Sequence, residues 1–92
     1  MKVYEATVHP HHGGFGMYEM GEPCVVEGVE SEEQWCLLAN ENGYNVREAG
    51  EFNGKVYGQN GATIYAIAPY DPKNGKTRED EQSFYAVWEV DE

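Results

Sequence analysis

This chain of 92 residues carries 17 acidic residues against six lysines and arginines, which gives a formal net charge of −11 with its three histidines neutral. A surface of that sign repels nucleic acid phosphates and anionic membranes and attracts a basic partner. Hydrophobic residues make up 40% of the chain and aromatic residues 13%. This composition excludes a disordered acidic tail, because such tails have few aromatic residues. We therefore expect one folded domain over residues 1–92 with a thin core.

The sequence indicates a soluble protein of the cytoplasm. No stretch approaches the roughly 20 apolar residues needed to span a bilayer, and the first residues lack the apolar run of a secretion signal. The chain begins with Met and is expected to be a complete small protein. Cys24 and Cys36 are too few for a disulfide framework, and their spacing is not that of a redox or zinc pair. Reduced, buried thiols are favoured, and a single disulfide is the alternative.

Alternation of apolar and polar residues predicts the first strands. Residues 1–8 alternate as a half-buried strand does. Two short strands are expected at residues 16–20 and 24–29, separated by the turn sequence Gly21-Glu22-Pro23.

The next segment predicts the only helix. Ser31-Glu32-Glu33-Gln34 matches a capping box, which predicts a helix over about residues 32–41, and Asn42-Gly43 suits its C-cap. Trp35, Leu38 and Ala39 fall on one stripe of this helix. Because so short a helix is not stable alone, we expect the stripe to pack on a sheet.

Beyond the helix, strands are expected at residues 44–52, 55–59, 62–69 and 83–90, with Asn53-Gly54 and Asn60-Gly61 as hairpin turns. Both faces of the last two strands carry apolar residues, which predicts central strands covered on each side, or on one side by a partner. Residues 70–82 are expected to form a mobile loop. The predicted fold class is α+β, an antiparallel sheet of about five to six strands with one short helix packed on it.

Three histidines offer the main candidate metal site. His9, His11 and His12 are clustered, and imidazoles this close can share a zinc, nickel or copper ion. Their spacing matches no known ligand pattern, and histidines beside Gly13 and Gly14 are typical of an exposed flexible loop. Absent or adventitious metal is therefore favoured, and no cofactor is expected.

No group of residues indicates catalysis, so we expect no enzymatic activity. Cys24 and Cys36 have apolar neighbours, which raise the pKa of a thiol. The carboxylate runs Glu32-Glu33 and Glu79-Asp80-Glu81 are typical of a solvated surface, whereas a general acid and base need contrasting environments in a cleft.

The seven tyrosines suggest a binding surface, because aromatic anchors combined with carboxylates are a familiar way to bind a basic protein. Tyrosines at sheet edges with their hydroxyls in water are the alternative. Phe15, flanked by glycines, and Tyr18 are the expected anchors. The charged face is expected where acidic residues are densest, at Glu27, Glu30, Glu32, Glu33, Glu79, Asp80 and Glu81.

Size and charge together predict an acidic protein-binding inhibitor that occupies a basic nucleic-acid-binding surface by imitating phosphates. In size and charge alone the chain resembles phage and mobile-element inhibitors of host nucleases, including anti-CRISPR and anti-restriction proteins. The expected partner is a nucleic-acid-binding protein or complex in the host cytoplasm, with no direct binding of nucleic acid or membrane. The alternatives are a metal-binding protein or minor enzyme that uses the histidine loop, and a small structural or regulatory homo-oligomer, for instance a homodimer through Tyr65, Ile67, Tyr85 and Val87.

Like-charge repulsion opposes folding of such an acidic chain, so added salt is predicted to stabilise it. The expected result is a urea midpoint, followed by circular dichroism, that rises from low to high NaCl. A midpoint that falls on addition of salt contradicts this prediction.

Overall fold

A computed structural model describes residues 1–10 and 18–91 of the chain. In these residues an antiparallel sheet of seven strands is combined with one α-helix and one 3₁₀ turn, which confirms the α+β prediction. The sheet has seven strands where five to six were expected. In chain order the elements are β1 (Lys2–Pro10), β2 (Tyr18–Met20), β3 (Cys24–Val25), α1 (Glu32–Glu41), β4 (Tyr44–Val56), β5 (Gln59–Asp71), β6 (Lys76–Thr77), η1 (Glu79–Glu81) and β7 (Ser83–Val90).

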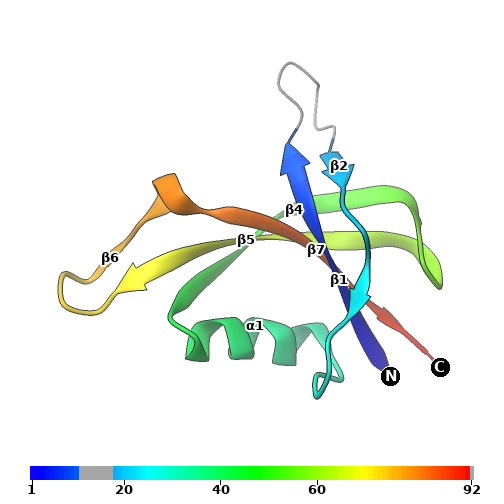
Figure 1. Cartoon of the computed structure of the whole chain (residues 1–92), viewed down its shortest axis with the longest axis horizontal. Helices are drawn as coiled ribbons and strands as arrows, with labels where there is room; N and C mark the ends of the chain where they lie inside the picture. The colour runs from blue at the N-terminus through cyan, green and yellow to red at the C-terminus, as the bar shows by residue number, and fades with distance from the viewer. Residues whose placement is uncertain (11–17, 92) are drawn as a thin grey trace.

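The sheet is a curled half-barrel with the strand order β2-β1-β7-β5-β4, while β3 pairs with β1 and β6 pairs with β5. The long β4–β5 ribbon bends, and α1 lies beneath the sheet (Figure 1). Register shifts between Glu48 and Gly50 and between Phe52 and Lys55 mark bulges in β4, and bulges bend a strand. The molecule measures 41 × 36 × 17 Å, so its core is thin, as its composition suggests.

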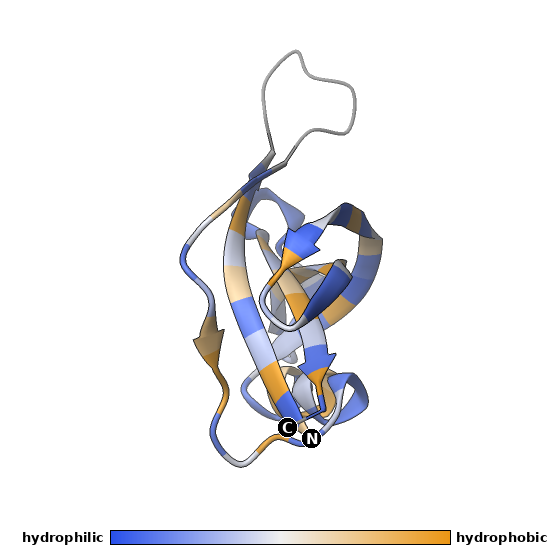
Figure 2. Cartoon of the chain, turned by 90° about the vertical axis from the view of Figure 1, so that its right-hand side faces the viewer, coloured by the Kyte–Doolittle hydropathy of each residue, from blue (hydrophilic) through white to orange (hydrophobic). Residues whose placement is uncertain are grey.

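Both faces of the central strands are buried, as predicted, and the chain itself covers them. On one face the buried cluster contains Ala6, Val8, Val56, Ala86, Trp88 and Val90. On the face toward α1 the cluster contains Val3, Val29, Trp35 and Val87. Figure 2 shows the alternation of hydrophobic and hydrophilic residues along the strands that produces the two faces.

The covered face includes the four residues considered for a homodimer. Val87 is fully buried, and Tyr65, Ile67 and Tyr85 pack against the cluster beneath α1. Burial of this face therefore requires no second copy of the chain.

Helix α1 begins and ends where the sequence predicts. Ser31 Oγ accepts a hydrogen bond from the Gln34 N–H at 3.1 Å, and Gln34 Oε1 accepts one from the Glu30 N–H at 2.7 Å. At the other end Asn42 is the C-cap, and Gly43 follows with a φ of +91°, a conformation that glycine adopts freely.

The predicted apolar stripe of the helix is buried at Trp35, but Leu38 is 41% exposed and is therefore only partly covered by the sheet. The indole of Trp35 fills the space between helix and sheet, with its ring centroid 5.4 Å from that of Tyr65 and 6.0 Å from that of Tyr85. Leu38, one turn later, is left at the edge of the interface.

The predicted hairpin turns at Asn53-Gly54 and Asn60-Gly61 are also wrong. The β4–β5 turn is Tyr57-Gly58, since Val56 pairs with Gln59, and Gly58 has a φ of +82°. Asn60 is paired with Lys55, and Asn53-Gly54 lies in the second bulge. Residues 44–56 therefore form one bulged strand, and the strand predicted at residues 55–59 is interrupted by this turn.

Residues 70–82, predicted as a mobile loop, contain the short strand β6 and the 3₁₀ turn η1. Tyr70 pairs with Thr77 and Asp71 with Lys76, and η1 follows. The Asp71 carboxylate closes this β5–β6 hairpin by accepting hydrogen bonds from the Lys73 N–H at 2.9 Å and from Asn74 Nδ2 at 2.8 Å. Local hydrogen bonds thus hold together a segment that has few apolar residues to pack.

Both cysteines are free thiols, as favoured from the sequence, but Cys24 is exposed and Cys36 is half-buried, so the expectation of buried thiols is wrong for Cys24. The predicted strand at residues 24–29 is only Cys24–Val25, because the chain turns at Gly28, whose φ is +79°. Across residues 1–10 and 18–91, no helix has both the length and the apolar character to cross a membrane.

The β4–β5 turn allows a test of the register. Gly58→Ala is expected to destabilise the protein more than Gly75→Ala, since both residues have positive φ, which costs roughly 1–2 kcal/mol for an L-residue. Only at Gly58 would the new Cβ also approach a core side chain, 2.8 Å from Val90 Cγ1, whereas Gly75 has open space around it. The free energy of unfolding of the two variants, from urea titration, checks this. Equal losses would show that Gly58 does not pack against Val90.

Candidate partner-binding surface

The seven acidic residues predicted as one charged face lie in two separate groups. Glu27 and Glu30 precede α1, and Glu32 and Glu33 are in its first turn. The other three residues form η1. Figure 1 shows η1 and the start of α1 at opposite sides of the molecule. The fold therefore divides these carboxylates between two surfaces with different surroundings.

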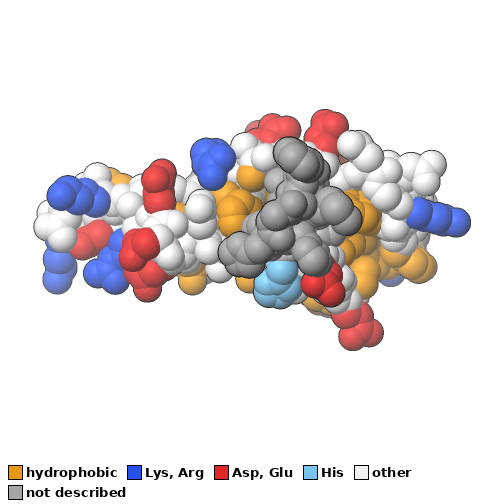
Figure 3. Space-filling model, turned by 90° about the horizontal axis from the view of Figure 1, so that it is seen from above, with side chains coloured by type: hydrophobic (Ala, Val, Ile, Leu, Met, Phe, Trp, Pro, Cys, Tyr) orange, Lys and Arg blue, Asp and Glu red, His pale blue; other side chains and the backbone are white. Residues whose placement is uncertain are grey.

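The surface around η1 is nearly balanced in charge. Arg78 Nη1 lies 3.1 Å from Glu81 Oε2, in an exposed pair of the kind that contributes about 1 kcal/mol or less. Arg47 Nη2 donates to Gln82 Oε1 at 3.4 Å, directly after η1. Together with the β5–β6 hairpin this end of the molecule holds four acidic residues (Asp71, Glu79, Asp80, Glu81) and four basic ones (Arg47, Lys73, Lys76, Arg78). Figure 3 shows basic and acidic side chains mixed at this end.

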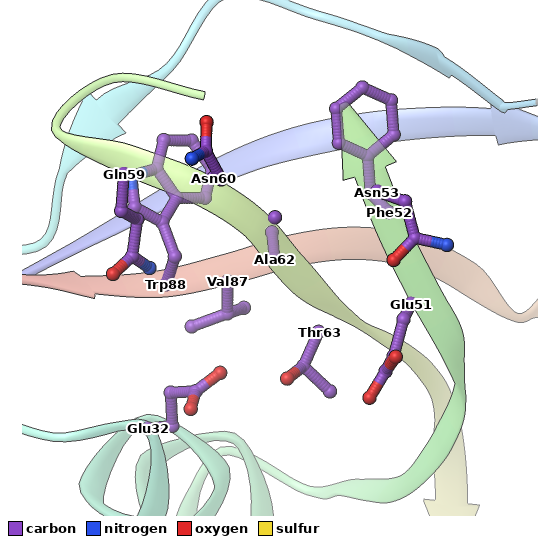
Figure 4. Close-up of a pocket in the computed structure, with 11 residues that line it drawn as sticks. Glu32, Glu51, Phe52, Asn53, Gln59, Asn60, Ala62, Thr63, Val87 and Trp88 are labelled. Atoms are coloured by element: carbon purple, nitrogen blue, oxygen red, sulfur yellow. The ribbon is translucent and has the colours of Figure 1, made fainter. Parts of the chain in front are cut away.

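The start of α1 faces a groove in the sheet instead. This groove of about 240 Å³ lies between α1 and the β4–β5 ribbon. Figure 4 shows the Glu32 carboxylate extending from α1 toward the sheet, with Thr63 between it and Glu51. Glu51 pairs with Thr63, which pairs with Val87, so neighbouring strands set the spacing across the groove. The groove is lined by polar groups, which are the carboxylates of Glu32 and Glu51, the Thr63 hydroxyl and the amides of Asn53 and Asn60, together with Val87 and Trp88.

Glu32 is the most perturbed carboxyl group of this surface. Burial raises the pKa of Glu32, a hydrogen bond with Thr63 lowers it, and the charges of Glu89 and Glu48 raise it further. These influences include two carboxylates and no cation. We call Glu32, Glu48, Glu51 and Glu89 the Glu32 cluster.

Glu89 holds two roles in this cluster. Its Oε2 accepts a hydrogen bond from the Glu32 backbone N–H at 2.8 Å, which places a carboxylate at the positive end of α1. That contact fixes the start of the helix against β7. The same contact brings the Glu89 charge close to the Glu32 carboxylate, so stabilisation of the helix and repulsion within the cluster have one source.

The remaining predicted site residues are dispersed. His9 is exposed on β1, and Tyr18 begins β2. Phe15, His11 and His12 lie outside the described residues. Within residues 1–10 and 18–91 no group of three or more His, Cys, Asp and Glu side chains is placed to hold a metal ion.

The tyrosines are divided between the core and the surface. Tyr4 stacks on Trp88 with ring centroids 5.8 Å apart and contacts Tyr57 at 5.0 Å, which adds to the core. Tyr44, Tyr57 and Tyr70 are exposed. Tyr65 and Cys36 are hydrogen-bonded to each other beneath α1, and burial raises the pKa of both groups. A raised thiol pKa at Cys36 agrees with its predicted structural role.

Sequence reasoning missed Glu48, Glu51 and Glu89. The alternation of β7 places Glu89 on the same face as Val87, and the alternation of β4 before its first bulge places Glu48 opposite Tyr65. The faces of Glu48 and Glu89 could therefore be deduced from alternation once the strand pairing was known. The face of Glu51 could not be deduced in this way, because the bulge between Glu48 and Gly50 shifts the register.

Comparison of the chain with models of protein families, with characterised proteins and with solved structures finds no match.

The Glu32 environment predicts a pH-dependent stability. The folded-state pKa of Glu32 lies above its ordinary value of 4.5. The contribution of Glu32 to the free energy of unfolding is therefore fully present below pH 4.5 and is lost as the pH rises through the folded-state pKa. Glu32→Gln is therefore expected to raise the urea midpoint at pH 7, with a gain that disappears below pH 4.5. Glu33→Gln, an exposed neighbour in the same turn, is the matched control. A gain that is independent of pH, or equal in the control, argues against a strained Glu32.

Proposed function

We propose that this protein is a non-catalytic, acidic binding protein that occupies a basic nucleic-acid-binding surface of another protein or complex. The observation that carries the proposal is the Glu32 cluster, in which a half-buried carboxylate lies near the charges of Glu89 and Glu48. A positive charge within about 4–6 Å lowers the pKa of such a group and favours its ionised form. A lysine or arginine supplied by a partner would therefore offset the electrostatic repulsion that opposes ionisation of Glu32 in the free protein.

Charge of the whole chain supports the same class of partner. At a net charge of −11 the protein repels nucleic acid and is attracted to surfaces that bind phosphates. The carboxylates would stand in for a run of phosphates, and binding would compete with nucleic acid for the same basic channel. The proposed context is that of a phage or mobile-element inhibitor acting in the cytoplasm on a host defence or nucleic-acid-processing complex, by anti-CRISPR or anti-restriction action.

The two acidic surfaces are expected to contribute unequally. Around η1, arginine and lysine side chains already compensate the carboxylates, so a basic partner gains little there. At the Glu32 cluster a basic partner meets charge that no cation offsets at Glu32, and because Glu32 is half-buried, its electrostatic interactions are less screened than those of an exposed carboxylate. We therefore assign the primary contact to the start of α1 and the β4–β5 ribbon.

Affinity capture tests the proposal. The immobilised protein is exposed to a bacterial lysate treated with nuclease, the column is washed at low and at high salt, and bound proteins are identified by mass spectrometry. The expected result is one nucleic-acid-binding protein or complex that is retained at low salt and released by nucleic acid. Absence of any such protein from the column contradicts the proposal.

Two double charge reversals locate the contact. Glu48→Lys with Glu51→Lys removes two exposed charges of the Glu32 cluster, whereas Glu79→Lys with Asp80→Lys makes the same change in net charge at η1. The first variant is expected to bind the captured partner at least about tenfold more weakly, equivalent to about 1.4 kcal/mol, and the second much less so. Equal losses would indicate a response to net charge alone, and no loss in either would exclude recognition by carboxylates.

A further inference from the structure

A second groove lies on the same side of the sheet, between the C-terminal half of α1 and strands β1, β4, β5 and β7. It is lined by Glu5, Trp35, Leu38, Tyr44, Ile67 and Tyr85, and we call it the α1 groove. Its volume of about 180 Å³ is below the roughly 300 Å³ at which small-molecule pockets begin. The space suits one long side chain of a partner rather than a whole ligand.

The walls of the α1 groove are apolar and partly uncovered. Leu38 is 41% exposed and Tyr44 is 38% exposed, although both lie at the rim of a hydrophobic contact. Trp35 is the only buried residue of α1, so the helix buries little of its own apolar surface. Coverage of this rim by an aliphatic stem would remove further apolar area from water.

The charges at the α1 groove are negative. Among the described residues that line it, Glu5 alone is charged, and its Oε2 accepts a hydrogen bond from Trp35 Nε1–H at 3.3 Å. Helix α1 also ends here: Ala39 and Asn42 line the groove, and the last turn has no basic residue to complement the partial negative charge of a helix C-terminus. A cation at this position would meet both a carboxylate and the carbonyl end of the helix.

Three aromatic rings complete the surroundings. Trp35, Tyr44 and Tyr85 line the groove, and the planes of Trp35 and Tyr85 are inclined by 58°. Aromatic faces attract cations, and the planar guanidinium group both stacks on rings and makes paired hydrogen bonds to a carboxylate. An ammonium group makes neither a stacked nor a forked contact, so the groove fits arginine better than lysine.

We propose that the α1 groove binds one arginine side chain of a protein partner, with the aliphatic stem against Leu38 and Ile67 and the guanidinium group at Glu5. This inference rests on the proposed function, because it names an anchor by which the basic partner would dock. It adds to that function a site separate from the Glu32 cluster, at the other end of the same helix.

The two tryptophans provide a direct test by nuclear magnetic resonance. The Trp35 indole N–H donates to Glu5 in the α1 groove, whereas the Trp88 indole N–H donates to the Tyr57 carbonyl at 2.8 Å elsewhere. The ¹⁵N-labelled protein is titrated with N-acetyl-arginine methylamide, and parallel titrations use the lysine and norleucine analogues. The expected result is a saturable shift of the Trp35 indole signal with the arginine probe, a dissociation constant on the order of 1 mM, and an unchanged Trp88 signal.

Variants separate charge from shape. Glu5→Gln keeps an oxygen that can accept a hydrogen bond from the Trp35 N–H but removes the charge. This substitution is expected to weaken binding of the arginine probe by about tenfold. Leu37→Ala is the matched control, because Leu37 is 54% exposed on the same helix and does not line the groove, so binding should be unchanged. Indole spectra of both variants without probe show whether the fold is retained.

Several results would overturn the inference. They are a Trp35 signal that does not move, equal shifts with the norleucine and arginine probes, and a Glu5→Gln variant that binds as well as the parent. The titration needs no partner protein, so a failure of this inference can be distinguished from a failure of the proposed function in the capture experiment.

Discussion

Pairing of β1 with β7 is the constraint on which the other features depend. The two strands are joined from Lys2 opposite Val90 to Val8 opposite Phe84, in the middle of the sheet. In this register Glu5 lies opposite Val87 and Val3 opposite Glu89, so Glu5 and Glu89 project toward α1. One carboxylate holds the Trp35 indole and the other holds the N-terminal turn of the helix. The position of α1, and with it both grooves, follows from this single pair of strands.

The protein uses its carboxylates in two distinct ways. Glu5, Glu89 and Asp71 act as acceptors that secure the helix and a hairpin, where a charged acceptor makes a stronger hydrogen bond than a neutral one. Glu32 is held near like charges, and burial adds to the cost of its ionisation. Strain of this kind reduces stability in the free protein and persists where surrounding structure enforces it. A functional surface is the usual place for such a conflict between stability and activity.

Local signals in the sequence predicted what is determined locally. Ser31, Gln34 and Asn42-Gly43 gave the helix within its observed bounds, because capping involves groups only a few residues apart. Alternation in residues 83–90 identified a strand buried on both faces. The Asn-Gly pairs misled, since a pair that suits a turn is also tolerated in a bulge, and pairing with β5 decided between these possibilities. The Glu32 cluster combines residues from α1, β4 and β7, so no pattern within one segment could reveal it.

The arrangement of β1 and β7 also has a consequence for the order in which the chain folds. The strand that occupies the centre of the sheet is the last in the sequence, and it lies between β1 and β5. Until β7 is available, β1 and β5 have no common neighbour, and the β4–β5 ribbon can form only as a separate hairpin. Closure of the loop between β1 and β7 carries a large entropic cost and gives a high contact order, which slows folding relative to a helical protein of equal length. During synthesis the chain therefore remains without its central sheet until β7 has left the ribosome.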